Sequence, residues 1–249
     1  MPVDAVVLAG RPNQGAFREV SDVPYEALLD VGGRPMVSYV LAALAAAREV
    51  GRVAVVGPPQ LGELVREHPF LLVPMGETVF DNVQAGLAAL EPAGKVLIAT
   101  SDIPLISGPM VDRFLKQCAA RPARLHYPVV RRELAEAKYP LVRRTYVTLA
   151  DGTFTGGNLF LAEPAAVAAA LEQGRRVFAY RKRPWKLLGL LGWTFVLRYL
   201  THRLTLGQVE ARASELLGFP GAAVVSPDPE VGVDVDWPQD LQLVRAALG

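Results

Sequence analysis

Two stretches near the start of the chain decide the fold: residues 3–10, VDAVVLAG, and residues 27–36, ALLDVGGRPM. The first is an apolar strand that runs into a glycine turn and then into RPNQG, and the second is a glycine turn that leads into a helix. Backbone N–H groups in such a loop can neutralise a triphosphate at the edge of a parallel sheet. The pattern predicts a nucleotide or phosphate ligand and leaves the reaction open.

Composition predicts one folded domain. The 249 residues are 51% hydrophobic and 20% charged, which excludes a disordered chain and allows a full α/β core. The formal net charge of +1 gives no reason to expect a nucleic-acid partner. One cysteine, Cys118, excludes an internal disulfide and a cysteine zinc cluster, and we interpret it as a core residue on a helix.

The sequence pattern indicates neither a signal peptide nor a membrane span. Its start lacks the basic and then apolar regions of a signal peptide. The longest apolar run, residues 187–197, is shorter than the ~20 residues of a membrane span and is followed by Arg198. We therefore expect a cytoplasmic protein.

The first half of the chain alternates between strands and helices. This alternation predicts a parallel sheet that is covered by helices on both faces. The expected strands are residues 3–8, 52–56, 70–73 and 95–99, and the expected helices are residues 35–47, 62–68, 78–90 and 107–118.

The second half is less regular. Segments 144–149 and 157–161 flank a turn at Asp151-Gly152, and no internal repeat or linker is present. The economical interpretation is one domain, residues 1–249, with a substrate-side subdomain at about 125–220. The remaining expected strands are residues 125–130 and 222–225, and the expected helices are residues 164–173, 205–217 and 238–248.

Carboxylates follow the strands at two distant places. Asp102 comes directly after an apolar strand, and Asp234 and Asp236 lie in GVDVDWPQDL. Ligands of open α/β sheets bind beyond the carboxyl ends of strands, and two converging carboxylates with a triphosphate would hold Mg²⁺. The metal would neutralise charge as phosphate oxygens are displaced. Alternatively, Asp102 caps a helix, and DVD is a solvated turn ahead of a helix with Asp240 in its first turn.

Five segments in this order resemble the MobA-like NTP transferase family. They are VVLAG with its loop, ALLDVGGRPM, GETVFDNVQAGLAAL, VLIATSDIPLIS and DVDWPQDL. The resemblance covers residues 3–118 and the last twenty residues, and is weaker between them. It implies the GT-A type of Rossmann-like fold, with three α/β/α layers and a mostly parallel central sheet. The wider group includes cytidylyltransferases of the isoprenoid and Kdo pathways and sugar-1-phosphate uridylyltransferases.

The resemblance also implies roles for individual residues of this chain. Asp102 and Asp236 would bind Mg²⁺, with Asp234 as a neighbour. Gly156, Gly157 and Asn158 would shape the acceptor pocket. The residues that would contact the nucleotide are Leu8, Ala9, Gly10, Arg11, Glu77, Thr78 and Asn82.

One departure from the family pattern concerns charge. The family usually has a lysine that binds phosphate in the pattern PK-x-LL, and here Glu26 of VPYEALL takes that place. A carboxylate beside a triphosphate is repulsive. Either Arg18, Arg34 or another basic residue supplies the positive charge, or activity toward NTPs is altered or lost.

The mechanism that the resemblance implies needs no protein nucleophile. An acceptor phosphate oxygen attacks the α-phosphorus of an NTP, pyrophosphate leaves, and positioning and charge neutralisation carry the catalysis. The resemblance of GETVFDNVQAGL to cytidylyltransferases favours CTP. The basic residues expected at the acceptor phosphate are Lys138, Arg143, Arg144 and the run 181–183, all of which could equally be solvated surface.

The nucleotidyltransferase interpretation does not by itself explain residues 181–200, RKRPWKLLGLLGWTFVLRYL. They could form a lid or pocket for an apolar substrate, a helix on an anionic membrane, or a buried helix or homodimer contact. We interpret His68, His126 and His202 as structural.

Two rival functions remain open. One is a degenerate relative that binds a nucleotide or a membrane without turnover, which Glu26 motivates. The other is an NAD(P)-binding Rossmann protein, which the lack of G-x-G-x-x-G disfavours.

Overall fold

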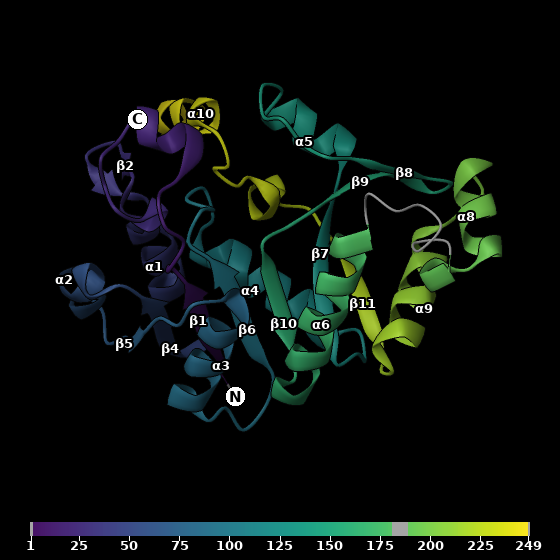
Figure 1. Ribbon diagram of the computed structural model, residues 1–249, viewed down its shortest axis with the longest axis horizontal. Helices are drawn as coiled ribbons and strands as arrows, with labels where there is room; N and C mark the ends of the chain where they lie inside the picture. The colour runs from purple at the N-terminus through teal and green to yellow at the C-terminus, as the bar shows by residue number, and fades with distance from the viewer. Residues whose placement is uncertain (1, 181–188, 249) are drawn as a thin grey trace.

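A nine-stranded sheet crosses the computed structural model, which describes residues 2–180 and 189–248, with the backbone course alone for 174–180 (Figure 1). The strand order is β5-β4-β1-β6-β10-β7-β9-β8, and β11 pairs with β7. The strands are β1 (Val3–Leu8), β4 (Val50–Gly57), β5 (Leu71–Pro74), β6 (Val96–Thr100), β7 (Leu125–Arg131), β8 (Val147–Leu149), β9 (Gly152–Gly156), β10 (Leu159–Ala162) and β11 (Gly221–Ser226).

The first half of the chain builds the parallel part of this sheet. Strands β5, β4, β1 and β6 are all paired in parallel. Alternate residues of β1 enter two different cores: Ala5 and Val7 pack on one face, and Val6 packs on the other. Because both faces are buried, these strands have to be apolar along their whole length.

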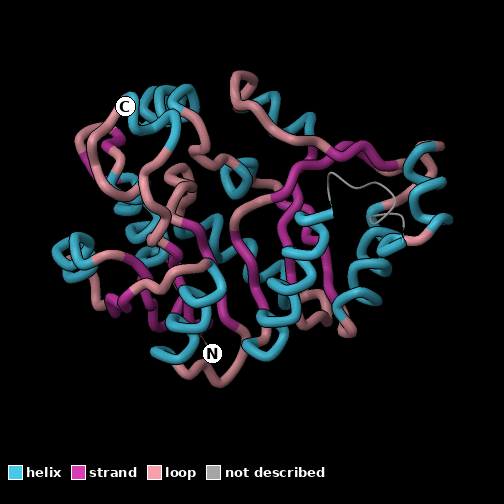
Figure 2. The backbone as a smooth tube through the Cα atoms, in the orientation of Figure 1, coloured by secondary structure: helices cyan, strands magenta, loops and turns pink. Residues whose placement is uncertain are grey.

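Helices cover both faces of the sheet, and Figure 2 shows the magenta strands between the cyan helices. Helices α1 and α4 pack together on the face of Ala5 and Val7, and α3 and α6 cover the face of Val6. The prediction of three layers around a mostly parallel sheet is confirmed. The helices of the first half and α6 are α1 (Met36–Ala46), α2 (Gly62–Arg66), α3 (Val79–Leu90), α4 (Gly108–Ala119) and α6 (Pro164–Tyr180).

The second half is organised around β7. Its first residues pair with β10 and its last residues with β9, both antiparallel, while β11 runs parallel along its other edge. The sequence pattern did not predict β9 or α5. Strand β9 reads GTFTG and lacks an apolar run, and α5 reads RELAEAK and is mostly polar. The helices of this half are α5 (Arg132–Lys138), α8 (Trp193–Leu200), α9 (Leu206–Leu217) and α10 (Pro238–Leu248).

Short elements complete the described chain. A two-stranded ribbon, β2 (Asp30–Val31) and β3 (Arg34–Pro35), precedes α1, and a 3-10 turn, η2 (Glu26–Leu28), precedes that ribbon. Within residues 2–180 and 189–248, no helix is long and apolar enough to cross a membrane. Cys118 is fully buried on α4, as expected. His126 is also fully buried, and its Nε2 lies 2.9 Å from the carbonyl of Arg121.

Close packing of α3 on the sheet depends on one glycine. A Cβ built on Gly86 would lie 2.5 Å from Cγ1 of Val6 and 3.1 Å from Cγ2 of Val56. Real Cβ atoms do not approach neighbours so closely, so any larger residue would push α3 away from β1 and β4. This contact sets the position of the helix whose first turn reaches the site described below.

We predict that Gly86→Ala destabilises the protein by about 1–3 kcal/mol, because overpacking outweighs the usual gain from replacing a helical glycine. Gly94→Ala is the matched control, since a Cβ there meets nothing within 4 Å. Urea unfolding at one pH measures both. Equal free energies of unfolding for the two variants would show that α3 is not held this closely.

Candidate functional site

Two cavities adjoin beyond the carboxyl ends of the parallel strands, where open α/β sheets bind their ligands. They meet where Arg11, in the wall of the larger, donates to Asp236, in the wall of the smaller, at 3.1 Å. The larger, of about 780 Å³, is lined by Leu8, Gly10, Arg11, Pro12, Glu26, Met75, Gly76, Glu77, Thr78, Val79, Asn82, Thr100, Ser101 and Asp102. The smaller, of about 420 Å³, is lined by Tyr127, Arg143, Arg144, Thr145, Thr155, Gly156, Gly157, Asn158, Asp234, Asp236, Trp237 and Asp240.

The backbone brings the predicted carboxylates to this boundary. The N–H of Val235 donates to the carbonyl of Asp102 at 2.9 Å, which ties the segment before α10 to the end of β6. Val233 and Val235 are buried in a core with Leu241 of α10. In an extended chain alternate residues face opposite sides, so Asp234 and Asp236 are directed away from that core and into the smaller cavity.

Asp102 carries an unsatisfied charge. Its Oδ1 atom is fully buried and has no hydrogen-bond partner. Burial raises the pKa of Asp102 to about 6, and the charges of Asp234 and Asp236 add to this rise, while the side chain of Thr100 and the charge of Arg11 oppose it. A buried carboxylate oxygen without a partner is costly, and a cation would remove that cost.

Asp234 and Asp240 are held differently. Oδ1 of Asp234 lies 3.4 Å from Nη2 of Arg144, whose side chain is buried. Burial raises the pKa of Asp234 even though Arg144 opposes the shift, and burial lowers the pKa of Arg144. Asp240 lies in the first turn of α10, where its Oδ2 accepts from the N–H groups of Asp236 and Trp237 at 3.2 and 2.9 Å. Asp240 therefore fixes the turn that presents Asp236.

Arg11 joins the two carboxylates on its side of the site. Its Nε lies 3.1 Å from Oε2 of Glu26, and its Nη1 donates to Oδ1 of Asp236. Burial first, and then the charges of Asp102 and Asp236, raises the pKa of Glu26 to about 7, while Arg11 opposes that rise. The pKa of Arg11 is raised, because the charges of Glu26 and Asp236 outweigh its burial. Arg11 therefore keeps its positive charge, and Glu26 loses its negative charge as the pH falls below about 7.

Most of the residues expected at a nucleotide lie on the wall of the larger cavity. Ala9 is the exception, since it is fully buried beneath the loop and its N–H donates to the carbonyl of Val56 at 2.8 Å. Thr78 and Asp81 form a reciprocal cap that fixes the start of α3 at the cavity. The Oδ1 of Asn82 accepts from the N–H of Gly76 at 2.7 Å. Thr78 and Val79 at the start of α3 line the larger cavity, and a helix N-terminus favours an anion.

Arg18 and Arg34 lie outside both cavities. Arg18 is exposed and donates to the carbonyl of Asp22 at 2.9 Å. The guanidinium of Arg34 lies 5.2 Å from the ring centre of Tyr39. Arg11 therefore takes the place at the site that these residues were expected to fill.

Two of the basic residues expected at the acceptor, Arg143 and Arg144, line the smaller cavity together with Gly157 and Asn158. Lys138 is instead paired with Glu230, and the run 181–183 lies outside the described residues. Sequence reasoning missed Tyr127 and Trp237 in the same wall. Trp237 follows Asp236 directly, which was the available signal, whereas Tyr127 reads as an ordinary strand residue.

The acidic side chains at this site do not by themselves form a complete set of metal ligands. Within the part of the chain that the structure describes, no three His, Cys, Asp or Glu side chains are grouped as ligands of one ion. Asp234 and Asp236 each have an arginine partner, and Asp102 has none. This arrangement suits Mg²⁺, which is usually held by one or two carboxylates together with substrate phosphates rather than by an all-protein cage.

Comparisons with known proteins find a family model and a partly matching relative. The family model described as the MobA-like NTP transferase domain matches residues 25–188. A curated 2-C-methyl-D-erythritol 4-phosphate cytidylyltransferase from Streptomyces coelicolor is 38% identical over 98 residues, which are 35% of this chain and 36% of that protein.

Solved structures of other proteins match the fold of this chain over nearly its whole length. The structure of a hypothetical transferase from Thermus thermophilus is 43% identical, covers 97% of this chain and 100% of its own, and has a TM-score of 0.81. A 4-diphosphocytidyl-2C-methyl-D-erythritol synthase from Anaerococcus prevotii is 13% identical, covers 99% and 98%, and has a TM-score of 0.58, which shows a shared fold.

We predict that Glu26 makes stability fall with rising pH. Its pKa is about 7 in the folded chain and 4.5 in the unfolded reference, so the folded chain binds this proton more tightly. The resulting stability is complete below about pH 4.5 and is lost as pH rises through about 7. The loss amounts to roughly 3 kcal/mol. Urea unfolding from pH 4.5 to 8 measures it.

Glu26→Gln should reduce this pH dependence and leave the part that the raised pKa of Asp102 contributes, and Glu19→Gln, at an exposed position, should leave it as in the wild type. Parallel curves for the wild type and Glu26→Gln would mean that the carboxyl of Glu26 is not the group that titrates.

Proposed function

We propose that this chain, which belongs to the family of MobA-like NTP transferase domains, transfers a nucleoside monophosphate from an NTP, with CTP as the favoured donor, to a phosphorylated small-molecule acceptor. The observation that carries the proposal is the position of Asp102, Asp234 and Asp236 on the boundary between two cavities. The larger cavity would take the NTP and the smaller one the acceptor.

The reaction forms a bond between an acceptor phosphate oxygen and the α-phosphorus and breaks the bond from that phosphorus to the bridging oxygen. Pyrophosphate leaves with the electron pair of the broken bond. The protein contributes position and charge rather than a nucleophile. The α-phosphorus would lie at the boundary of the cavities, so that attack from the smaller one is in line with departure into the larger.

Basic residues on both sides would bind the phosphates. Arg11 would contact the triphosphate from the loop after β1, and Arg143 and Arg144 would contact the acceptor phosphate. Arg11 supplies the cation that the family's usual lysine would provide. Glu26 pairs with Arg11, and because its pKa is about 7, its repulsion of a triphosphate weakens as the pH falls below that value.

Mg²⁺ is the proposed cofactor. The free, buried Oδ1 of Asp102 and the carboxylate of Asp236 are hard oxygen donors that fit it. When bound, it would neutralise the charge that develops on the phosphate oxygens. Arg11 contacts Oδ1 of Asp236, and an incoming triphosphate would offer Arg11 an alternative partner and leave that oxygen to the ion.

The favoured donor is CTP, because the curated relative from Streptomyces is named a cytidylyltransferase and the resemblance of GETVFDNVQAGL points the same way. Glu77, Thr78 and Asn82 of that segment lie in the wall of the larger cavity, where the base and ribose would be bound.

A second candidate is a relative that binds a nucleotide without turnover. The pairing of Arg11 with Asp236 favours it, because that pairing occupies a carboxylate which the metal needs. The two functions separate cleanly in experiment: both predict NTP binding, and only the first predicts release of pyrophosphate.

Arg11 should dominate binding of the triphosphate. We predict that Arg11→Met weakens binding of CTP–Mg²⁺ about tenfold or more, as expected for the loss of a charge-assisted contact. Arg18→Met, which changes an exposed arginine outside the cavity, should bind CTP as the wild type does. Thermal shift with all four NTPs and Mg²⁺ measures this, since a ligand at 100 times its Kd stabilises by ~2.7 kcal/mol. Equal loss in both variants would contradict the role of Arg11.

Asp102 should be required for turnover and costly for stability. We predict that Asp102→Asn lowers pyrophosphate release from CTP at least about 100-fold in a screen of phosphorylated acceptors. The same variant should be more stable than the wild type at pH 8. The pKa of Asp102 is about 6 in the folded chain and 3.8 in the unfolded reference, so its charged form is disfavoured by folding at that pH.

Asp22→Asn, at an exposed position outside both cavities, is the matched control for both measurements. An Asp102→Asn protein that still releases pyrophosphate at the wild-type rate would refute the assignment of the site.

A further inference from the structure

A third cavity, of about 300 Å³, lies between α9 and the sheet, and its walls are apolar. Val129, Leu149 and Phe154 line it from the sheet, and Leu206, Val209 and Leu217 line it from α9. It shares Tyr127, Thr155 and Gly156 with the smaller of the two cavities at the site. The apolar cavity therefore adjoins the pocket proposed for the acceptor, and these three residues form part of the wall of both.

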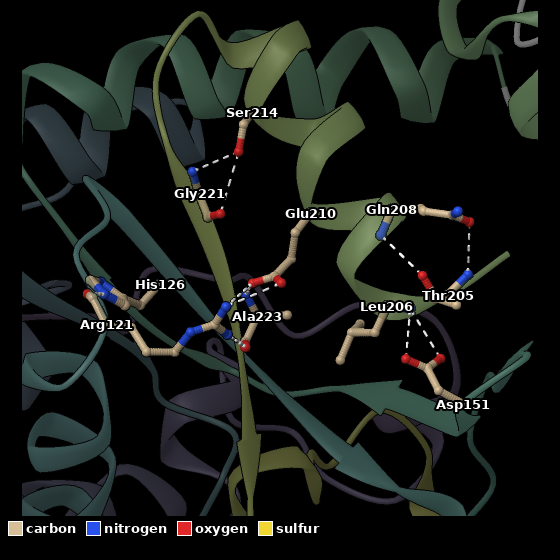
Figure 3. Close-up of polar contacts among 10 residues, drawn as sticks. All are labelled: Arg121, His126, Asp151, Thr205, Leu206, Gln208, Glu210, Ser214, Gly221 and Ala223. Carbon is tan, nitrogen blue, oxygen red and sulfur yellow. Dashed lines mark hydrogen bonds and ion pairs between the residues drawn. The ribbon is translucent and has the colours of Figure 1, made fainter.

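Polar contacts hold α9 at a fixed position over the sheet (Figure 3). Both carboxylate oxygens of Asp151 accept from the N–H of Leu206, at 3.0 and 3.1 Å. Ser214 Oγ accepts from the N–H of Gly221 at 2.9 Å, nearer the other end of the helix. Between them, Glu210 accepts from the N–H of Ala223 at 2.6 Å and pairs with Arg121 at 2.9 Å. These contacts fix α9 at several points along its length, so the cavity beneath it is a defined feature of the fold.

The same contacts remove the charge from the cavity. Among the described residues that line it, Glu210 carries the one formal charge, and Figure 3 shows its carboxylate directed at Arg121 and Ala223. Apolar cavities are poor sites for water and bind apolar molecules instead. A volume of about 300 Å³ lies at the lower end of the range for small-molecule sites. The chemistry that fits the space is a hydrocarbon chain.

Tyr127 marks the change from polar to apolar wall. A Cβ on Gly156 would fall 1.8 Å from the Tyr127 hydroxyl, so the ring occupies space that only glycine leaves free. Tyr127 lines both cavities, and burial, with a smaller contribution from the charge of Asp234, raises the pKa of its hydroxyl. Tyrosine commonly stands at such boundaries because its body is apolar and its tip is polar.

We propose that the acceptor is amphiphilic: its phosphate binds beside Arg143 and Arg144, and its hydrocarbon chain passes Tyr127 into the cavity under α9. The inference rests on the proposed function and names the class of its acceptor. Neither the family match nor the relatives assign a site to this cavity.

Helix α8 and its surroundings support an acceptor of this kind. Phe195 packs on the cluster of Val129, Leu149, Phe154 and Leu204, and the first three of these residues line the cavity. Trp193, Leu197 and Leu200 recur at helical spacing and are exposed. In the sequence, residues 173–209 contain eight Lys and Arg and no acidic residue. An apolar stripe within a basic segment suits an anionic lipid surface, which is where a phosphate with a hydrocarbon chain resides.

The test is binding of alkyl phosphates of increasing length to the full chain, measured by calorimetry below their micelle concentrations. Ethyl, hexyl and decyl phosphate share the headgroup, and decanol shares only the chain. We expect decyl phosphate to bind at least about 100-fold more tightly than ethyl phosphate, since each buried methylene contributes roughly threefold or more. Affinity that does not depend on chain length would overturn the proposal, and so would decanol binding as tightly as decyl phosphate.

Two alanines on α9 provide a matched pair of variants. Ala213 lines the cavity, and Ala211 is exposed. Ala213→Phe should lower the affinity for decyl phosphate at least tenfold and leave that for ethyl phosphate unchanged, whereas Ala211→Phe should behave as the wild type. If Ala213→Phe does not fold, Val209→Phe fills the same cavity from one turn earlier. An equal effect of the filling variant and Ala211→Phe would overturn the proposal.

Binding of CTP–Mg²⁺, measured separately on each variant, tests the proposed function independently of the amphiphilic acceptor. Chain-length dependence without CTP binding would reject the proposed function and retain an apolar site. CTP binding without chain-length dependence would reject the amphiphilic acceptor and retain the nucleotidyltransferase.

Discussion

The backbone hydrogen bond from Val235 to Asp102 is the constraint on which the rest of the site depends. It joins the loop after β6 to a segment near the end of the chain. On one side of that segment Val233 and Val235 enter a core, and this burial stabilises the contact. The alternation of an extended chain then directs Asp234 and Asp236 to the other side. The three carboxylates meet at the boundary of the two cavities because Val235 pairs with Asp102.

Collecting these carboxylates has an electrostatic cost that the fold only partly offsets. Burial raises the pKa of Asp102, Asp234 and Glu26. Arg11 and Arg144 neutralise part of the charge, and the buried oxygen of Asp102 remains unpaired. We expect a cation and a polyphosphate to stabilise a site of this kind. A glutamate in place of the family's usual lysine is consistent with the proposal, because Glu26 pairs with Arg11, the arginine that we propose for the lysine's role.

Sequence reasoning recovered the parallel half of the fold because its strands are buried on both faces and are apolar throughout. It also predicted that Asp102 and DVDW converge, and the structure brings them to adjoining cavities, since both stand at the ends of recognisable segments. It missed β9 and α5, which are stabilised by neighbours rather than by their own apolar pattern. It named Arg11 among the nucleotide-contacting residues, but not its pairs with Glu26 and Asp236, because a charge pair between the loop after β1 and the end of the chain has no local signature. The apolar cavity depends on the spacing between α9 and the sheet, which is a tertiary property.

The most direct test of the account is an anomalous difference map from crystals grown with CTP and Mn²⁺, an ion that scatters where Mg²⁺ would bind. The account predicts one strong peak between the carboxylates of Asp102 and Asp236, with the triphosphate in the larger cavity and Arg11 moved from Asp236 to a phosphate. A peak at another place in the molecule, or CTP bound outside that cavity, would contradict it.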